Sequence, residues 1–254
     1  MIKTVLCFAY VVAGVIGLVP IGLLVVILSF LGLRRPMSVV MYRLAQGWAR
    51  LFMRVVGCRM TVIGRENIPA RGGLCFASNH ASLVDILMLL AYAGRPIGFI
   101  AKKELRAIPI LGMWIYIIGG LFVDRNSPRK ALRTIAEGAR RIKAGGAMVI
   151  FPEGSRSRGA GLLPFRPGAF KLASQSEATV VPVALCGTYD VFERNRRACA
   201  CPVTVEFCAP VRVADLPMEA RKTALCEMVR ETISASLERS ERAHSAQSQG
   251  GGKG

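Results

Sequence analysis

A long uncharged stretch at the N-terminus is the feature that most constrains this chain. No charged residue occurs from Val5 to Leu33, and about 20 consecutive apolar residues are enough for a helix to cross a membrane. A secretory signal peptide is the alternative. It is disfavoured because the apolar run is too long and no small-x-small cleavage site precedes Arg34-Arg35. We therefore expect a retained, membrane-associated helical segment.

The length of this segment leaves its path through the bilayer open. A single straight helix over 5–33 would be about 43 Å long at roughly 1.5 Å per residue, whereas the hydrocarbon core is about 30 Å thick. Pro20 and several glycines allow a kink, a tilt or a re-entrant bend. The sequence does not choose between a helix that spans the bilayer and one that only dips into it.

The charge distribution indicates what lies next to the apolar segment. The formal net charge is +18, and every charged residue before Glu66 is basic. A basic excess can serve a nucleic acid or an anionic bilayer, but its position directly after an apolar segment favours the bilayer, so we expect no nucleic-acid partner. By the positive-inside rule, Arg34-Arg35 place the following domain on the cytoplasmic side, which would be that of a bacterial inner membrane.

The eight cysteines are scattered and form no C-x-x-C pair. In a cytoplasmic domain they are most simply reduced, buried small residues. Cys199 and Cys201 could hold a metal ion, but no histidine lies near them in the sequence, so we expect no metal site and no cofactor.

Residues Ser38 to Val56 predict an amphipathic helix. Arg43, Arg50 and Arg54 fall on one narrow arc of a helical projection. A second arc collects apolar side chains, namely Val40, Leu44, Trp48, Leu51 and Val55. Such a helix either lies in the headgroup layer or packs its apolar stripe on the rest of the protein. Both readings stay open.

From Arg59 onward the pattern alternates between strands and helices. Strands are predicted in "GLCFAS", "PIGFIAK", "GGLFVDR", "AMVIFPEG", "ATVVPVAL" and "VTVEFCAP", and helices in "SLVDILMLLAYAG" and "SPRKALRTIAEGARRIKAGG". This alternation predicts an α/β domain with a mainly parallel central sheet flanked by helices. We expect an N-terminal membrane anchor over 1–58, the α/β domain over 59–240 with a last helix from Met218 to Arg239, and a disordered tail over 241–254.

His80 is the candidate catalytic base. It lies in "SNHASLVDIL", between a predicted strand and a predicted helix, and the only other histidine, His244, is in the polar tail. Ser82 and Asp85 fit a capping box with Ser82 at the N-cap. His80 would then feel the positive end of the helix dipole, which favours the neutral imidazole. Asp85 could orient the ring, so capping and orienting compete for one carboxylate.

A covalent serine mechanism is disfavoured for Ser82. It stands two residues after His80 and lacks a nucleophile elbow such as G-x-S-x-G.

Basic residues follow several predicted strands. "FPEGSRSRG" places Glu153, Gly154 and Arg156 in a loop suited to a phosphate. Asp124-Arg125 end another strand, and Lys102 and Lys103 follow a third. Each cluster alone is better explained by solvated charges. Together they favour one phosphate-binding site, because α/β sheets place their sites at the carboxyl ends of strands.

These motifs together resemble the glycerophosphate acyltransferase superfamily, especially the 1-acyl-glycerol-3-phosphate acyltransferases. The family's N-H-x-x-x-x-D motif is similar to Asn79 through Asp85. Its second, third and fourth blocks resemble Gly120 to Arg125, Phe151 to Ser157, and Val181-Pro182-Val183. The order and spacing agree, and the resemblance spans about Val62 to Cys208.

The resemblance implies direct acyl transfer without an acyl-enzyme. His80 would deprotonate the free sn-2 hydroxyl of 1-acyl-glycerol-3-phosphate while Asp85 holds the ring. The oxygen would attack the thioester of acyl-CoA or acyl-carrier protein, giving phosphatidic acid for phospholipid biosynthesis. The implied substrate-binding residues are Lys102, Asp124, Arg125, Glu153, Gly154 and Arg156. Arg156 would hold the acceptor phosphate and Glu153 would help to position it.

Two other functions stay open. The same chemistry could acylate a different lysolipid, such as lyso-ornithine lipid. A noncatalytic module that binds anionic lipid is the other alternative, and the intact His80–Asp85 pair argues against it.

Overall fold

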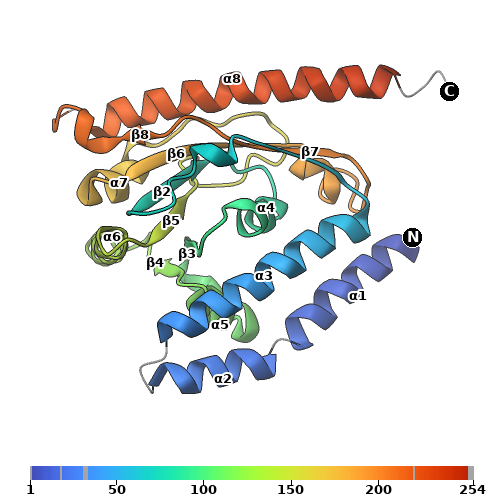
Figure 1. Cartoon of the computed structure of the whole chain (residues 1–254), viewed down its shortest axis with the longest axis horizontal. Coiled ribbons are helices and arrows are strands. Elements are labelled where there is room, and N and C mark those ends of the chain that lie inside the picture. The colour runs from blue at the N-terminus through green and yellow to red at the C-terminus, as the bar shows by residue number, and fades with distance from the viewer. Residues whose placement is uncertain (1, 18, 31–33, 220, 251–254) are drawn as a thin grey trace.

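A mainly parallel sheet forms the centre of the fold. The computed structural model describes residues 2–17, 19–30, 34–219 and 221–250. Over these residues an eight-stranded sheet has the order β1-β7-β6-β2-β5-β3-β4, with β8 paired to β6 (Figure 1). The strands are β1 Arg59–Ile63, β2 Leu74–Ser78, β3 Gly98–Lys102, β4 Leu121–Val123, β5 Ala147–Ile150, β6 Thr179–Cys186, β7 Pro202–Phe207 and β8 Val211–Arg212.

Strand direction divides the sheet in two. Strands β2 to β6 run parallel to one another. β1 and β7 are parallel to each other, but β7 and β8 run antiparallel to β6. The predicted α/β class is therefore confirmed, and all six predicted strands are present. β1 and β8 were not predicted as strands. β1 lies at the edge of the sheet, and its burial alternates between exposed and half-buried residues.

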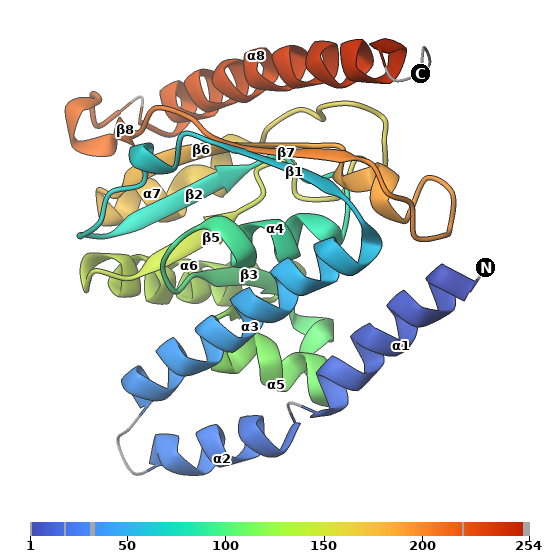
Figure 2. The same cartoon turned by 45° about the vertical axis from the view of Figure 1, so that its right-hand side comes forward.

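Helices cover both faces of the sheet (Figures 1 and 2). They are α1 Ile2–Gly17, α2 Val19–Phe30, α3 Arg34–Val56, α4 Val84–Tyr92, α5 Pro109–Ile117, α6 Pro128–Lys143, α7 Lys171–Ser176 and α8 Arg221–Gly250. Successive residues of β2 point to opposite faces. Leu74 and Phe76 join the core under α3 and α4, and Cys75 and Ala77 join the core under α6, α7 and α8. Both faces of β2 are therefore buried, which explains its continuous apolar sequence.

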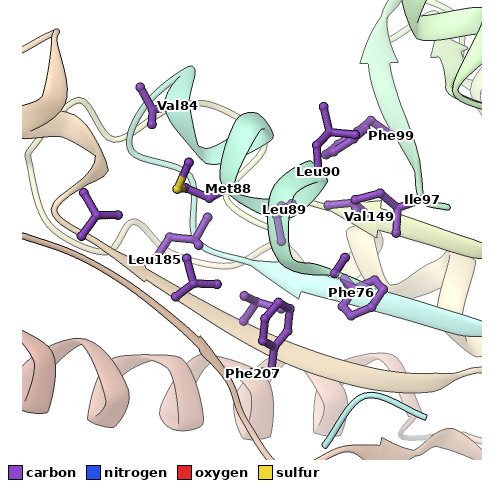
Figure 3. Packing of buried hydrophobic residues seen from close by; sticks show 14 of the residues in the cluster. Phe76, Val84, Met88, Leu89, Leu90, Ile97, Phe99, Val149, Leu185 and Phe207 are labelled. Carbon is purple, nitrogen blue, oxygen red and sulfur yellow. The ribbon is translucent and has the colours of Figure 1, made fainter. Parts of the chain in front are cut away.

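α4 is held firmly against the sheet. Met88 and Leu89 are fully buried, and Leu90 is nearly so. Figure 3 shows Met88 near Leu185 of β6, Leu90 near Phe99 of β3, and Leu89 between them. Burying one such side chain contributes roughly 1.5–3 kcal/mol. This packing fixes the first turn of α4, which carries Asp85.

The N-terminal apolar segment forms two helices, and Figure 1 shows α1 and α2 at an angle to each other beside α3. Among the described residues, Thr4–Val25 is the one stretch long and apolar enough to cross a membrane, judged by length and composition alone. Only 14% of it is buried. Leu6 and Ile27, each 60% exposed, illustrate how much apolar surface these helices leave uncovered.

α3 packs on α4, but not through the stripe that the sequence indicated. Its buried apolar side chains are Met41, Tyr42, Ala49, Phe52, Met53 and Val56. Four members of the predicted stripe, Val40, Leu44, Leu51 and Val55, are 39–47% exposed. The fifth, Trp48, stacks on Tyr10 of α1. The helix therefore has two apolar faces, one packed on the core and one largely uncovered.

The C-terminal tail is a correction to the sequence-based prediction. Residues 241–250, predicted to be disordered, continue α8, and 251–254 lie outside the described residues. The reason is that the inward face of the helix does not end at Arg239. Ile233, Ser236 and Ser240 are buried at helical spacing, and His244 continues this row. Its Nε2 lies 2.9 Å from Oγ1 of Thr204 on β7.

His244 makes the stability of the protein depend on pH. Burial lowers the pKa of His244 from its usual 6.5, and the Arg59 charge adds to this, while Asp190 and Glu241 oppose it. Below about pH 6.5 the unfolded chain binds the proton more readily than the folded chain. We therefore expect the free energy of unfolding to fall as pH decreases from 6.5 towards the lowered pKa. Chemical denaturation at several pH values measures this slope.

The matched variants for this prediction are His244→Gln and Ala243→Gln. His244→Gln should flatten the slope, whereas the exposed neighbour Ala243 should leave it unchanged when replaced. Equal slopes in the wild type and His244→Gln would show that another group controls the pH dependence.

Candidate active site

His80 and Asp85 form a hydrogen-bonded pair between β2 and α4. Nδ1 of His80 lies 2.8 Å from Oδ2 of Asp85, and the two side chains are 14% and 0% exposed. The carboxylate accepts from Nδ1–H, so the lone pair of the imidazole is on Nε2. No described residue bonds to Nε2. This is the arrangement in which a histidine accepts a proton from a substrate hydroxyl.

Asp85 holds the turn that precedes α4 and orients His80 with the same oxygen. Besides His80, Oδ2 accepts hydrogen bonds from the backbone N–H groups of Ala81 and Ser82, each at 2.8 Å. The predicted competition between the two roles is therefore absent. The predicted N-cap is one residue off, because the helix has Leu83 at that position. The Oγ of Ser82 accepts instead from the N–H of Val84 at 2.9 Å.

The loop after β5 packs against His80. The Phe151 ring stacks on the imidazole with centroids 4.0 Å apart and planes inclined by 18°. The N–H of Ser157 donates to the carbonyl of His80 at 2.8 Å. This main-chain bond joins two loops that are more than seventy residues apart in the chain. The Phe151 ring therefore packs on one face of the imidazole, and Asp85 holds its Nδ1.

Glu153 supports this loop from inside the protein. It is only 3% exposed. Its Oε1 accepts from the backbone N–H of His80 at 2.6 Å, and its Oε2 accepts from the N–H of Leu163 at 3.2 Å. Burial raises the pKa of Glu153, while these two backbone donors act to lower it. Both oxygens are occupied by main-chain donors, so Glu153 faces the His80 loop and not an open site.

Arg125 and Gly154 are brought together. Nη1 of Arg125 donates to the carbonyl oxygen of Gly154 at 2.7 Å. Gly154 has φ 74°, and a Cβ on it would lie 3.2 Å from the Arg166 guanidinium. A side chain at this position would therefore be strained and crowded.

The lysine linked to Asp124 is Lys103. Its Nζ lies 2.9 Å from Oδ2 of Asp124, and this hydrogen bond is the main reason that the pKa of Asp124 is lowered. Lys102, the lysine predicted to bind substrate, lies 3.7 Å from Glu104 and its side chain is 58% exposed. Three of the predicted site residues, Lys102, Asp124 and Arg156, form no hydrogen bond or ion pair with any of the others in the described part of the chain.

Arg156 is connected to the catalytic turn through Glu193. Nη1 of Arg156 lies 3.1 Å from Oε1 of Glu193. The same carboxylate accepts from the N–H of Leu83 at 3.0 Å and from the hydroxyl of Ser82. Glu193 therefore ties the arginine loop to the start of α4, and the Arg156 side chain keeps 29% of its surface exposed.

A comparison with protein families shows which family this chain belongs to. The family model described as Acyltransferase matches residues 59–186, which include His80, Asp85 and the loop after β5. This chain belongs to the acyltransferase family. The resemblance inferred from its motifs is confirmed.

Individual relatives of this chain carry one common name. A "1-acyl-sn-glycerol-3-phosphate acyltransferase" of Cocos nucifera is 34% identical over 168 residues, 65% of this chain and 54% of that protein. The protein of that name in Escherichia coli K12 is 34% identical over 167 residues, 65% of this chain and 66% of its own length. The chain spans little more than half the length of the first curated relatives it matches.

A solved structure extends the similarity beyond the matched domain. The protein in the "Crystal Structure of the 1-acyl-sn-glycerophosphate (LPA) acyltransferase, PlsC, from Thermotoga maritima" is 26% identical to this chain, with a TM-score of 0.79. The match covers 94% of this chain and 97% of that one.

Glu193 is a site residue that sequence reasoning missed. It follows the end of β6, where the short turn Thr188–Val191 leads back towards α4. The rule that located the other candidates, a polar side chain shortly after a parallel strand, applies to Glu193 as well. The signal was hidden because Glu193 stands in a charged run, "ERNRR", that is also typical of a solvated loop.

Proposed function

We propose that this protein transfers a fatty acyl group from a thioester donor to the free sn-2 hydroxyl of 1-acyl-glycerol-3-phosphate, giving phosphatidic acid. The observation that supports the proposal is the His80–Asp85 pair, in which Nε2 of His80 bonds to no described residue. Arg125 and Arg156 lie on loops joined to it. The printed names of the relatives and of the Thermotoga maritima enzyme support the choice of acceptor.

In this mechanism His80 acts as general base. Nε2 accepts the hydroxyl proton as the acceptor oxygen bonds to the thioester carbon. The C–S bond then breaks, and the thiol leaves with a proton that the imidazolium can return. Asp85 stabilises the positive charge that His80 carries between these steps. No acyl-enzyme forms, because Ser82 is held by Glu193 and donates its hydroxyl proton away from His80.

The acceptor phosphate is assigned to the basic residues at the strand ends. Arg156 and Arg125 are the main candidates, with Lys102 as predicted from the family and Lys103 as its neighbour. Asp124 and Glu193 hold Lys103 and Arg156 in place, so these cations are oriented before substrate binds, which reduces the cost of ordering them. The Gly154 backbone is kept close by Arg125.

The N-terminal helices are assigned to the membrane. Residues 1–58 would serve as anchor, with the domain that begins at residue 59 on the cytoplasmic side of a bacterial inner membrane, as the basic residues after the apolar segment predict. The exposed apolar side chains of α1 and α2 support this placement. An anchor suits a substrate that resides in the bilayer, and acyl-CoA or acyl-carrier protein would arrive from the aqueous side.

The experiment that tests the function is turnover by the purified full chain. It is supplied with acyl-CoA or acyl-carrier protein and a panel of lysolipids, and the products are identified by mass spectrometry. We expect phosphatidic acid from 1-acyl-glycerol-3-phosphate. Turnover only with lyso-ornithine lipid would assign the enzyme to another acceptor. No turnover with any acceptor and either donor would favour a noncatalytic lipid-binding protein.

Arg156→Ala tests the phosphate assignment. A charge-assisted hydrogen bond contributes about 1.5–3 kcal/mol, and about 1.4 kcal/mol corresponds to tenfold. We expect the acceptor KM to rise about 10- to 100-fold with a smaller change in kcat. The control is Arg158→Ala in the same loop, since Arg158 is exposed and makes no ion pair with a described residue. An unchanged KM for Arg156→Ala would remove this residue from the phosphate site.

A further inference from the structure

A second cluster of arginines lies away from the candidate active site. It surrounds an open pocket of about 410 Å³, here called the arginine pocket, which is lined by Arg50, Arg54, Cys58, Met60, Arg65 and Tyr92. Its walls come from the last two turns of α3, from β1 and the residues flanking it, and from the end of α4. Tyr92 and Asp85 stand at opposite ends of α4, about 10 Å apart along the helix axis at ~1.5 Å per residue.

The charges in this pocket are not balanced by the protein. Among the described residues, no carboxylate forms an ion pair with Arg50, Arg54 or Arg65, although Glu66 is the chain neighbour of Arg65. All three positive charges act on the hydroxyl of Tyr92 and lower its pKa against the larger raising effect of burial. Three guanidinium groups that converge in this way repel one another unless an anion joins them.

Arg50 is already fixed in position. Its Nε donates to the carbonyl oxygen of Ala91 at 2.9 Å, and its guanidinium carbon lies 5.5 Å from the centre of the Tyr92 ring. The two terminal nitrogens of Arg50 take no part in these contacts. Because a guanidinium is planar and permanently charged, it binds phosphate oxygens in a two-pronged geometry. The pocket therefore suits a phosphate group.

The surroundings distinguish a lipid phosphate from a soluble one. Leu51 and Val55 follow Arg50 and Arg54 directly on α3, and they are 47% and 40% exposed. Successive residues are about 100° apart on a helix, so an exposed apolar face adjoins the arginine face. A ligand with an anionic head and apolar chains would satisfy both faces at once.

We propose that the arginine pocket binds the phosphate of an anionic membrane phospholipid, with the acyl chains along Leu51 and Val55. This lipid is neither the acceptor nor the product in the candidate active site. It is a bilayer lipid that holds the end of α3 and the end of α4 at the headgroup layer. The proposal concerns binding, so it stands or falls independently of the acyltransferase activity proposed above.

The test measures lipid binding by the full-length protein in detergent. The His80→Ala variant is used throughout, so that turnover plays no part. It is titrated with dioctanoyl phosphatidylglycerol, dioctanoyl phosphatidylcholine and inorganic phosphate by calorimetry. Arg54 and Arg65 are exposed, so replacing them with glutamine should leave the core intact, which a melting curve checks. The matched control is Arg43→Gln, an exposed arginine on the same helix that does not line the pocket.

We expect Arg54→Gln and Arg65→Gln each to weaken phosphatidylglycerol binding about tenfold or more, and Arg43→Gln to change it less than twofold. Arg156→Ala should leave it unchanged, because that residue belongs to the candidate active site. Equal binding by the double variant Arg54→Gln/Arg65→Gln and its parent would overturn the proposal. Inorganic phosphate that binds as tightly as phosphatidylglycerol would overturn the lipid assignment, and so would equal binding of phosphatidylcholine.

Discussion

Replacing His80 with alanine is expected to lower the rate of acyl transfer by about 10²–10⁴-fold, the usual contribution of a positioned general base. Nε2 is the atom that would accept the hydroxyl proton, and its direction is set by the bond from Nδ1 to Asp85 and by the Phe151 ring. The loss should appear in kcat with both acyl-CoA and acyl-carrier protein. The measurement is initial rate against acceptor concentration.

Two controls separate lost chemistry from lost structure. The melting temperature of His80→Ala should stay near that of the wild type, since the His80 backbone bonds to Glu153 and Ser157 do not involve the ring. His244→Gln removes the other histidine, which is engaged with Thr204 and Cys186 on the far side of β6 and β7 from α4, and it should transfer acyl groups normally. Activity near the wild-type level in His80→Ala would place the base elsewhere.

The strands were predictable because local pattern and burial agree there. β2, β5 and β6 are buried along nearly their whole length, so their uninterrupted apolar runs carry an unambiguous signal. The C-terminal part of α8 was predicted wrongly for the opposite reason. Its later turns hold a buried serine and a half-buried histidine, Ser240 and His244, and polar residues of this kind are also typical of a disordered tail. Only the contact with β7 distinguishes the two.

The contact between His80 and Asp85 was predictable from their spacing alone. His80 and Asp85 are five residues apart across a turn and the start of a helix, which limits how far apart they can lie. The basic residues were not predictable in the same detail. Which of Lys102 and Lys103 reaches Asp124 depends on the direction of one side chain at the end of a strand. A one-residue shift along a strand reverses that direction, and the sequence contains no signal for it.

The role of Glu153 shows where a motif and its geometry differ. The family resemblance implies contact with the acceptor, whereas both carboxylate oxygens accept from backbone N–H groups of His80 and Leu163. We therefore propose that Glu153 is a positioning residue. Glu153→Ala would leave two buried donors without partners, each at a cost of about 1–3 kcal/mol. We expect a lower melting temperature and a large loss of kcat, with little change in the acceptor KM.

Glu153→Gln separates positioning from substrate contact. Its amide oxygen can still accept from the His80 N–H, but its amide nitrogen cannot accept from Leu163, so activity should lie between the wild type and Glu153→Ala. A selective rise in the acceptor KM, with kcat and stability preserved in both variants, would instead show that Glu153 contacts the substrate. Such a result requires that a carboxylate only 3% exposed in this structure becomes accessible when the acceptor binds.

The charge of Glu153 supplies a second, independent readout. Burial raises its pKa above the usual 4.5, so the folded protein holds this proton more tightly than the unfolded chain. The associated stabilisation is complete below the usual value and is lost as pH rises through the raised pKa. Glutamine does not titrate, so the stability of Glu153→Gln relative to the wild type should increase with pH across that window. A pH-independent difference would mean that the carboxylate is not desolvated, and the positioning role would lose its physical basis.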